Sequence, residues 1–149
     1  MRCYFEDLKV GDAFLSGPIG VSAGEMVAFA REFDPQPFHC DAEAAQASDF
    51  GALAASGWHT AALAMRLFVT GSLQFEGGAI GLGVDELRWP AAVWPDDELT
   101  LTTEVVELRA SRSKPGRGII RIRNVLRNQR QEIVLSYLAT AMVQRRPAR

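Results

Sequence analysis

The spacing of apolar residues changes near Gly71, from a helical period before it to alternation with polar residues after it. Alternation is typical of strands that bury one face. The pattern predicts four strands, at residues 79–89, 98–109, 117–127 and 132–144. One face of the second strand would hold Leu99, Leu101, Thr103 and Val105. One face of the last strand would hold Ile133, Leu135, Tyr137, Ala139, Ala141 and Val143.

The first half of the chain predicts a short strand at 13–21 followed by helices. Ser22 and Glu25 have the spacing of a capping box, in which each side chain satisfies a backbone N–H at the start of a helix. The helix predicted at 24–33 must end before Pro35, because the residue preceding a proline avoids the helical conformation. Its buried face would hold Met26, Ala30 and Phe33.

Two more helices are predicted before Gly71. Asp41 can cap a short helix at 41–48, and a longer helix begins near Ser56 and continues through Phe68. The longer helix is apolar around most of its circumference, and such a helix is normally wrapped by the rest of the fold. Helices followed by antiparallel strands therefore predict an α+β fold in which a sheet covers one long helix.

Length and composition predict one globular domain over residues 1–149, with 48% apolar and 23% charged residues. No apolar run approaches the roughly 20 residues that span a bilayer. The acidic residues near the N-terminus do not fit a secretory signal. Cys3 and Cys40 are too few for a disulfide framework, so we expect a cytoplasmic protein without a membrane partner.

The net charge of −2 gives no overall attraction to nucleic acid, but the basic residues are unevenly distributed. No acidic residue occurs between Glu107 and Glu132. The basic band in this interval consists of Arg109, Arg112, Lys114, Arg117, Arg121, Arg123, Arg127 and Arg130. A local band of this kind favours a compact polyanionic ligand over a long polymer. The alternative is that most of these residues are solvated strand and loop positions.

The stretch EFDPQPFHCD, at 32–41, places a carboxylate and an imidazole on either side of two prolines. Asp34 precedes His39 by five residues, and Pro35 and Pro37 between them would stop a helix and stiffen the bend. Asp34 ahead of a proline is also a common start of a turn, and His39 could cap one. A site and a purely structural bend are therefore both compatible with the stretch.

This stretch, with the order of elements around it, resembles the MaoC-like dehydratases, the family of (R)-specific enoyl-CoA hydratases with the hot-dog fold. The family signature is an aspartate, one residue, an asparagine, a proline, one residue and a histidine. Asp34, Pro37 and His39 match it, and Gln36 stands where the family has asparagine. The resemblance covers nearly the whole chain and is strongest from AFAREFDPQPFHCD through DFGALAASGWHTAALAM.

Downstream, the family has a histidine-glycine pair at the start of its central helix. This chain keeps the glycine as Gly57 and has Ser56 in place of the histidine, with Trp58 and His59 following. The stretch VDELRWPAAVWPDDELTLTTEVVEL, at 84–108, resembles the family's strand that enters a proline-marked turn and then an aspartate-bearing one.

The resemblance implies a catalytic role for three residues. Asp34 and His39 would together orient and activate one water for addition to an α,β-unsaturated thioester. The backbone N–H of Gly57 would bind the thioester oxygen, because helix N-termini carry unpaired donors and positive charge. Gly57 could instead be only a tight entry into the helix.

The resemblance also gives candidate substrate-binding residues. Gln36, Ser56, Trp58 and His59 lie next to the catalytic candidates in the sequence. Packing is the alternative for Trp58, and an imidazole satisfied against a neighbouring element is the alternative for His59. Coenzyme A carries phosphates that arginine recognises well. Its candidate partners from the basic band are Arg112, Arg121 and Arg123, which in hot-dog dimers can belong to the other chain.

These implications predict reversible hydration of a trans-2-enoyl-CoA to a (3R)-3-hydroxyacyl-CoA by a homodimer or a higher homo-oligomer. Coenzyme A would enter as part of the substrate, and neither a redox cofactor nor a metal is required; the spacing of Asp34, His39 and His59 fits no zinc pattern. A hot-dog acyl-CoA thioesterase and a non-catalytic acyl-CoA-binding subunit are the alternatives. The sequence does not indicate the acyl length, although a pocket closed by Trp58, Phe68 or Trp89 would favour small substrates.

Overall fold

The structure is a computed structural model that describes residues 2–149, and its main element is one antiparallel sheet of five strands. The strand order is β1-β3-β4-β5-β2, so that β1 and β2 form the two edges. All four predicted strands are present within two residues of their predicted bounds. The strands are β1 (Ala13–Gly20), β2 (Ile80–Arg88), β3 (Glu98–Ala110), β4 (Arg117–Arg127) and β5 (Ile133–Gln144).

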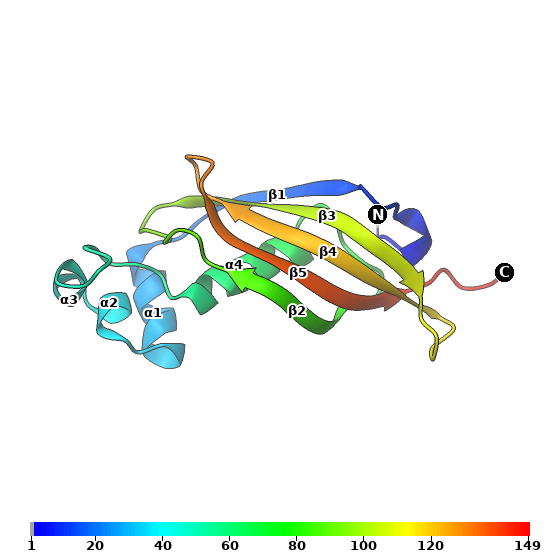
Figure 1. Cartoon of the computed structure of the whole chain (residues 1–149), viewed down its shortest axis with the longest axis horizontal. Helices are drawn as coiled ribbons and strands as arrows, with labels where there is room; N and C mark the ends of the chain where they lie inside the picture. The colour runs from blue at the N-terminus through cyan, green and yellow to red at the C-terminus, as the bar shows by residue number, and fades with distance from the viewer. Residues whose placement is uncertain (1) are drawn as a thin grey trace.

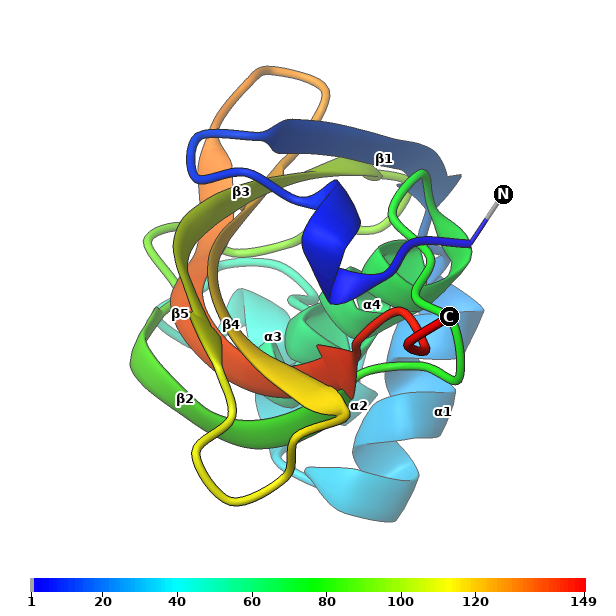
Figure 2. The ribbon, with the colours of Figure 1, turned by 90° about the vertical axis from the view of Figure 1, so that its right-hand side faces the viewer.

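The sheet curves around the long helix α4 (Gly57–Thr70), which crosses its concave face (Figures 1 and 2). Leu63, Ala64 and Leu67 are buried on the side of α4 that faces the sheet. The helix begins at the predicted glycine, directly after Ser56, whose backbone is extended (φ −53°, ψ 136°). A curved antiparallel sheet wrapped around one long helix confirms the predicted α+β class and hot-dog fold.

The predicted alternation correctly identifies the inner face of the central strands. All four residues assigned to the inner face of β3 are buried: Leu99, Leu101, Thr103 and Val105. On β5, the buried members of the predicted face are Leu135, Tyr137, Ala141 and Val143. Ile133, by contrast, is exposed, because it is the first residue of β5 and adjoins the turn that follows β4.

Helix α1 (Ala23–Phe33) has the predicted N-cap, since the Ser22 hydroxyl accepts a hydrogen bond from the Glu25 N–H at 3.1 Å. Met26 and Ala30 are buried as predicted. The prediction is wrong for Phe33, which is exposed. It lies in the last turn of α1, which projects beyond the end of the sheet, and its ring packs on Phe29 of the same helix (Figure 1).

Two short helices separate α1 from α4: α2 (Pro37–Cys40) and α3 (Ala42–Gln46). The expectation that the prolines exclude any helix is wrong for α2. Pro37 is its first residue, a position where the missing N–H of proline costs nothing and its fixed φ suits the helix. Gln36 before it is extended, as a residue preceding proline should be. A short 3₁₀ helix, η1 (Phe5–Asp7), precedes β1 and was not predicted.

Three structural observations concern the expectations about membranes, disulfides and metals. Of the helices within residues 2–149, none has the length and apolar character to cross a membrane. Cys3 and Cys40 are both free thiols. The described part of the chain gathers no group of three or more His, Cys, Asp or Glu side chains suited to a metal ion.

Candidate active site

Asp34 and His39 converge, although a tight bend separates them in the chain. Asp34 is the C-cap of α1, and His39 lies in α2. His39 Nε2 is 3.4 Å from Asp34 Oδ2. Backbone bonds from the Gln36 N–H to the Asp34 carbonyl (2.7 Å) and from the His39 N–H to the Gln36 carbonyl (3.0 Å) hold the bend. The two prolines fix φ at two of its positions, so the side chains are presented by a stiff segment.

The backbone carbonyl of Ala54 sets the protonation of the His39 ring. His39 Nδ1 lies 2.7 Å from this oxygen, and a carbonyl oxygen can only accept a hydrogen bond. Nδ1 therefore carries the proton, and in the neutral ring the lone pair of Nε2 is directed toward Asp34. A neutral imidazole nitrogen and a carboxylate oxygen are both acceptors, so one donor placed between them can bond to both.

Asp34 is held by two donors besides its proximity to His39. The Ser56 hydroxyl donates to Oδ2 and the Gln36 side-chain amide donates to Oδ1, each at 2.7 Å. Partial burial raises the pKa of Asp34, but the hydrogen bonds from Ser56 and Gln36 outweigh it and lower the pKa below its ordinary value. Asp34 is therefore a fixed, ionised carboxylate at neutral pH.

Gly57 opens α4 beside this pair. As the first residue of the helix, it has an N–H without a partner in the helix itself. Trp89 covers Gly57 closely: its indole N–H donates to the Gly57 carbonyl at 2.8 Å. A Cβ at position 57 would lie 2.7 Å from Trp89 Cε2, well inside van der Waals contact. Glycine is required here for packing as well as for close approach of a ligand to the backbone.

A cavity of about 560 Å³ brings these groups together. Asp34, His39 and Gly57 all line it. Trp58 and Trp89 pack edge to face with ring centroids 5.3 Å apart, and Phe50 and Trp94 with centroids 6.5 Å apart. The remaining lining residues are Asp49, Phe50, Ala55, Trp58, Thr60, Trp89, Pro90, Ala91, Ala92, Val93 and Trp94. The cavity thus has acid–base groups and a helix start within a mostly apolar, aromatic surround.

Three of the residues predicted to bind substrate fall into two groups. Trp58 lines the cavity with a largely exposed ring, so packing is not its main role. Gln36 and Ser56 instead bond to Asp34, and neither lines the cavity. Their polar atoms are used to hold the carboxylate. Phe68, a candidate for closing the pocket, is a buried core residue away from this cavity.

His59 lies outside the cavity, which corrects its assignment to substrate binding. Its ring is buried and stacks on Phe29, with centroids 4.7 Å apart and planes 8° apart. Burial lowers the pKa of the His59 imidazole, and the Glu25 carboxylate opposes the shift in part. Its buried Nδ1 has no hydrogen-bond partner among residues 2–149. His59 is a packing residue of the contact between α1 and α4.

The arginines predicted to bind coenzyme A do not line this cavity within one chain. Arg121 pairs with Asp85 at 3.1 Å, and Arg123 lies 3.9 Å from Glu104. Arg112 lines a separate cavity of about 420 Å³, together with Arg109 and Lys114. A contact from these residues to a ligand bound near Asp34 would have to come from a second copy of the chain.

Sequence reasoning missed several residues that shape the site. The Ala54 carbonyl left no signal, because any residue can offer a backbone oxygen. Phe50 and Trp94 reach the cavity from segments remote in the sequence, and the pattern of each segment alone does not indicate this. Ser56 was named from the sequence as a substrate-binding candidate, but its hydrogen bond to Asp34 was not predicted.

The chain belongs to the family of MaoC-like domain proteins, whose family model matches residues 9–124. A solved structure of a MaoC-like dehydratase from Rhodospirillum rubrum is 50% identical, with a TM-score of 0.93, over 98% of this chain and 99% of that one. The unliganded R-hydratase PhaJ1 from Pseudomonas aeruginosa is 25% identical, with a TM-score of 0.80, over 97% and 88%. The (R)-hydratase from A. caviae involved in PHA biosynthesis is 26% identical, with a TM-score of 0.75, over 95% and 99%.

Proposed function

We propose that this protein reversibly hydrates a trans-2-enoyl-CoA to a (3R)-3-hydroxyacyl-CoA. The observation that carries the proposal is the convergence of Asp34 and His39, with Nε2 and Oδ2 3.4 Å apart, in a cavity that also contains the start of α4. Membership in the MaoC-like family and the similarity to two structures named R-hydratases support hydration as the general activity. The acyl length and the stereochemistry belong to the proposal.

In the proposed reaction, one water donates a hydrogen bond to Asp34 and another to His39 Nε2. Its oxygen attacks the β-carbon while one O–H bond breaks and the proton moves to the acid–base pair. The π-electrons of the double bond shift toward the thioester and then form a bond between the α-carbon and a proton returned by the same pair. The water is thus added across the double bond with no net change in the protein. Positioned acid–base groups of this kind contribute about 10²–10⁴-fold in rate.

The negative charge that develops on the thioester oxygen needs a donor. The Gly57 N–H at the start of α4 supplies one, and the partial positive charge of the helix N-terminus adds to it. An oxyanion donor of this kind contributes about 2.7–4 kcal/mol in the transition state. A thioester bound against the aromatic walls would displace water from the reacting atoms and strengthen this interaction.

We also propose that the active form is a homodimer joined along β2. This strand is an edge of the sheet, and Ile80, Leu82 and Val84 on it are each more than half exposed. An exposed apolar edge strand is a template for pairing with another strand. Two copies related by a twofold axis would pair their β2 strands antiparallel, placing the cavity lined by Arg112 of one copy near the catalytic cavity of the other. Across this interface Arg112 would then contact coenzyme A phosphates bound to the other copy. Arg121 and Arg123 would do so as well.

The test is the loss of the conjugated enoyl-thioester absorbance when the purified protein is mixed with crotonyl-CoA. We expect wild type to be active and Asp34→Asn and His39→Gln to lose at least about 100-fold in kcat/KM. Glu43→Gln, an exposed carboxylate in α3 that does not line the cavity, is the control and should match wild type. Active variants at both positions would refute the assignment.

A parallel assay for free thiol separates the alternatives. A hydratase releases no coenzyme A, whereas a thioesterase does so with saturated acyl-CoA. The imidazole beside Asp34 favours the hydratase, since it supplies the second hydrogen bond to the attacking water. Tight acyl-CoA binding without turnover over a broad substrate panel would instead indicate a binding subunit.

A further inference from the structure

One wall of the candidate cavity is a continuous segment, Trp89–Trp94, that leads from β2 into a tight turn. The turn spans Trp94 to Asp97, and the Asp97 N–H donates to the Trp94 carbonyl at 3.2 Å. Pro95 is its second residue, and Asp96, its third, has φ of 67°. Proline followed by a residue in the left-handed region is the pattern of a type II turn. The direction in which the wall leaves the sheet is therefore set at this turn.

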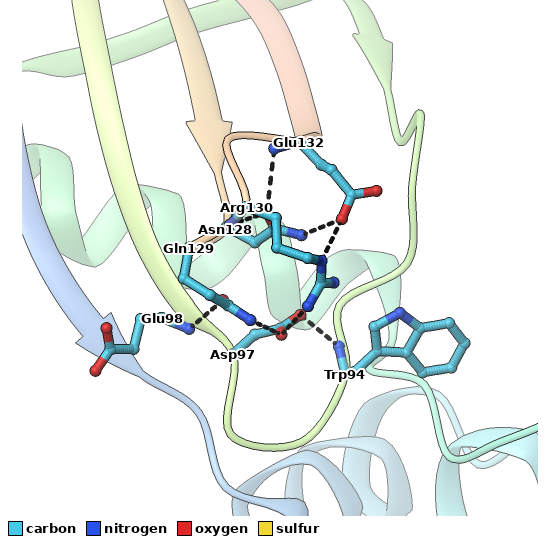
Figure 3. A network of polar contacts seen from close by, with 7 residues as sticks. All are labelled: Trp94, Asp97, Glu98, Asn128, Gln129, Arg130 and Glu132. Atoms are coloured by element: carbon cyan, nitrogen blue, oxygen red, sulfur yellow. Dashed lines mark hydrogen bonds and ion pairs between the residues drawn. The ribbon is translucent and has the colours of Figure 1, made fainter.

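The side chain of Asp97 fastens the turn from inside (Figure 3). Asp97 is only 3% exposed, and its Oδ2 accepts a hydrogen bond from the Trp94 backbone N–H at 2.9 Å. Its Oδ1 accepts from the Gln129 side-chain amide at 2.9 Å and lies 4.0 Å from Arg130 Nη1. A buried carboxylate is tolerated only when its oxygens are paired in this way. Asp97 thus joins the cavity wall to a different part of the chain.

That second part is the turn between β4 and β5, residues 128–132, which is held by hydrogen bonds of its own (Figure 3). The Asn128 side-chain oxygen accepts from the backbone N–H groups of Arg130 (2.9 Å) and Glu132 (3.1 Å). Arg130 Nε donates to Glu132 at 2.7 Å. Gln129 is held at both ends, since its oxygen accepts from the Glu98 N–H at 3.0 Å while its nitrogen donates to Asp97.

The wall is also connected to the start of α4. The Ala55 N–H donates to the Val93 carbonyl at 2.9 Å, and the Trp89 indole donates to the Gly57 carbonyl at 2.8 Å. A displacement of the wall therefore changes both the aromatic surface of the cavity and the surroundings of Gly57. Misplacement of a binding surface by about 1 Å can cost about 100-fold in rate.

We propose that Asp97 and Gln129 are positioning residues: together they use the β4–β5 turn to fix the wall Trp89–Trp94 in the geometry that binds the acyl thioester. Neither residue lines the cavity, and both act through the Trp94 backbone. The kinetic part of this inference rests on the proposed hydration. The structural part, an ordered Trp94 amide that depends on Asp97 and Gln129, does not.

The hydrogen bond from the Gln129 amide to the Asp97 carboxylate can be tested by exchanging its donor and its acceptor. In Asp97→Asn, the side-chain oxygen can still accept from Trp94, but its amide then faces the amide of Gln129, donor against donor. Rotating the Gln129 amide does not help, because its nitrogen would then face the Glu98 N–H. In the Asp97→Asn, Gln129→Glu double variant, the new amide donates to one carboxylate oxygen while the other accepts from the Glu98 N–H. Every hydrogen bond is then restored, and only the bond between positions 97 and 129 runs in the opposite direction.

Two measurements are made on the single variants, the double variant and wild type. Amide hydrogen exchange at Trp94 reports the wall without reference to activity, and steady-state kinetics with crotonyl-CoA report its effect on the site. We expect Asp97→Asn to raise KM and the Trp94 exchange rate by about three- to tenfold each, the effect of one lost hydrogen bond, with kcat within about twofold. The double variant should return both values to within about twofold of wild type.

Gln129→Ala provides a milder variant at an exposed position, in case Asp97→Asn does not fold. It should shift KM and Trp94 exchange in the same direction. Gln131→Asn lies in the same turn, where its φ of 64° suits asparagine, and should change neither. Wild-type exchange rates at Trp94 in both Asp97→Asn and Gln129→Ala, or failure of the double variant to restore them, would overturn the inference. Normal exchange behaviour in a protein that hydrates nothing would contradict only the proposed function.

Discussion

Trp89 lies directly over Gly57, with its indole N–H bonded to the glycine carbonyl and the five-membered ring of the indole against the place where a β-carbon would be. This contact joins the cavity wall to the first residue of α4, 32 positions away in the chain. A side chain at position 57 would therefore displace Trp89, which forms part of the aromatic wall of the cavity.

Gly57→Ala is therefore expected to impair both stability and activity. The added methyl group would lie 2.7 Å from Trp89, and overpacking of this kind costs about 1–3 kcal/mol. Displacement of the helix start should lower kcat/KM by about 10- to 100-fold, measured with crotonyl-CoA. Gly24→Ala is the matched control, since Gly24 is also in the first turn of a helix but has no neighbour closer than 3.9 Å. It should leave activity unchanged and add about 0.5–1 kcal/mol of stability.

Ser56→Ala should change the pH profile of the reaction. The Ser56 hydroxyl stabilises the ionised form of Asp34, so its removal raises the pKa of this carboxyl. The acid limb of kcat/KM against pH should therefore move to higher pH. On the plateau we expect a loss of about tenfold, a fraction of the roughly 10²–10⁴-fold that positioned acid–base groups contribute. Ser72→Ala is the control, because the Ser72 hydroxyl donates to the Leu15 carbonyl, and it should leave the acid limb of the pH profile in place. An acid limb that does not move in Ser56→Ala would contradict the role of Ser56.

His59 should make the fold sensitive to mild acid. Its pKa is lowered in the folded state from an ordinary value of 6.5, so the unfolded chain binds the proton more readily. The stability that this residue contributes is thus complete above pH 6.5 and is lost as the pH falls below it. His59→Phe keeps the stacking on Phe29 and should reduce the fall in unfolding free energy between pH 7 and 5, measured by denaturant titration. Trp58→Phe, next in the chain, should retain the wild-type dependence.

The buried polar network on the inner face of the sheet should be important for stability. Asn124 accepts a hydrogen bond from Thr103 at 2.5 Å and donates to the Tyr137 hydroxyl at 3.0 Å. Tyr137→Phe removes an acceptor from a buried amide and should cost about 1–3 kcal/mol in unfolding free energy. Tyr4→Phe, the other tyrosine and largely outside the core, should change it by less than about 0.5 kcal/mol. Equal effects of the two substitutions would argue against a role for the network.

The proposed dimer predicts a dependence on the exposed face of β2. Val84→Lys places a charge on this edge and should shift the protein toward monomer in sedimentation velocity. Val10→Lys replaces another exposed valine, outside any strand, and should leave the association state unchanged. A monomeric wild type would remove the basis for coenzyme A contacts from the partner.

Much of the fold could be predicted because it depends on local periodicity. The change of spacing at Gly71 separates α4 from the strands, and the alternation in β3 identifies its buried face without error. The errors lie where context overrides the local pattern. Pro37 begins a helix instead of excluding one, and Phe33 has the right spacing for burial but lies beyond the sheet that would cover it.

From the sequence, only those site residues could be predicted that belong to short local motifs. Asp34 and His39 are five residues apart, and Gly57 opens a recognisable helix, so all three could be named from the sequence. The Ala54 carbonyl, the wall Trp89–Trp94 and the link from Asp97 to Gln129 depend on contacts between distant segments. His59 shows the opposite error: a polar residue next to the site in sequence points to the other side of its helix and packs on Phe29.

The candidate catalytic groups lie on the excursion between α1 and α4 and at the N-terminal end of α4, and the span that precedes β3 adds the wall Trp89–Trp94. The strand ladder along the rest of the helix does not contribute a side chain to them. The lining of the cavity can therefore vary by substitution in these two loops while the strands of the sheet stay unchanged.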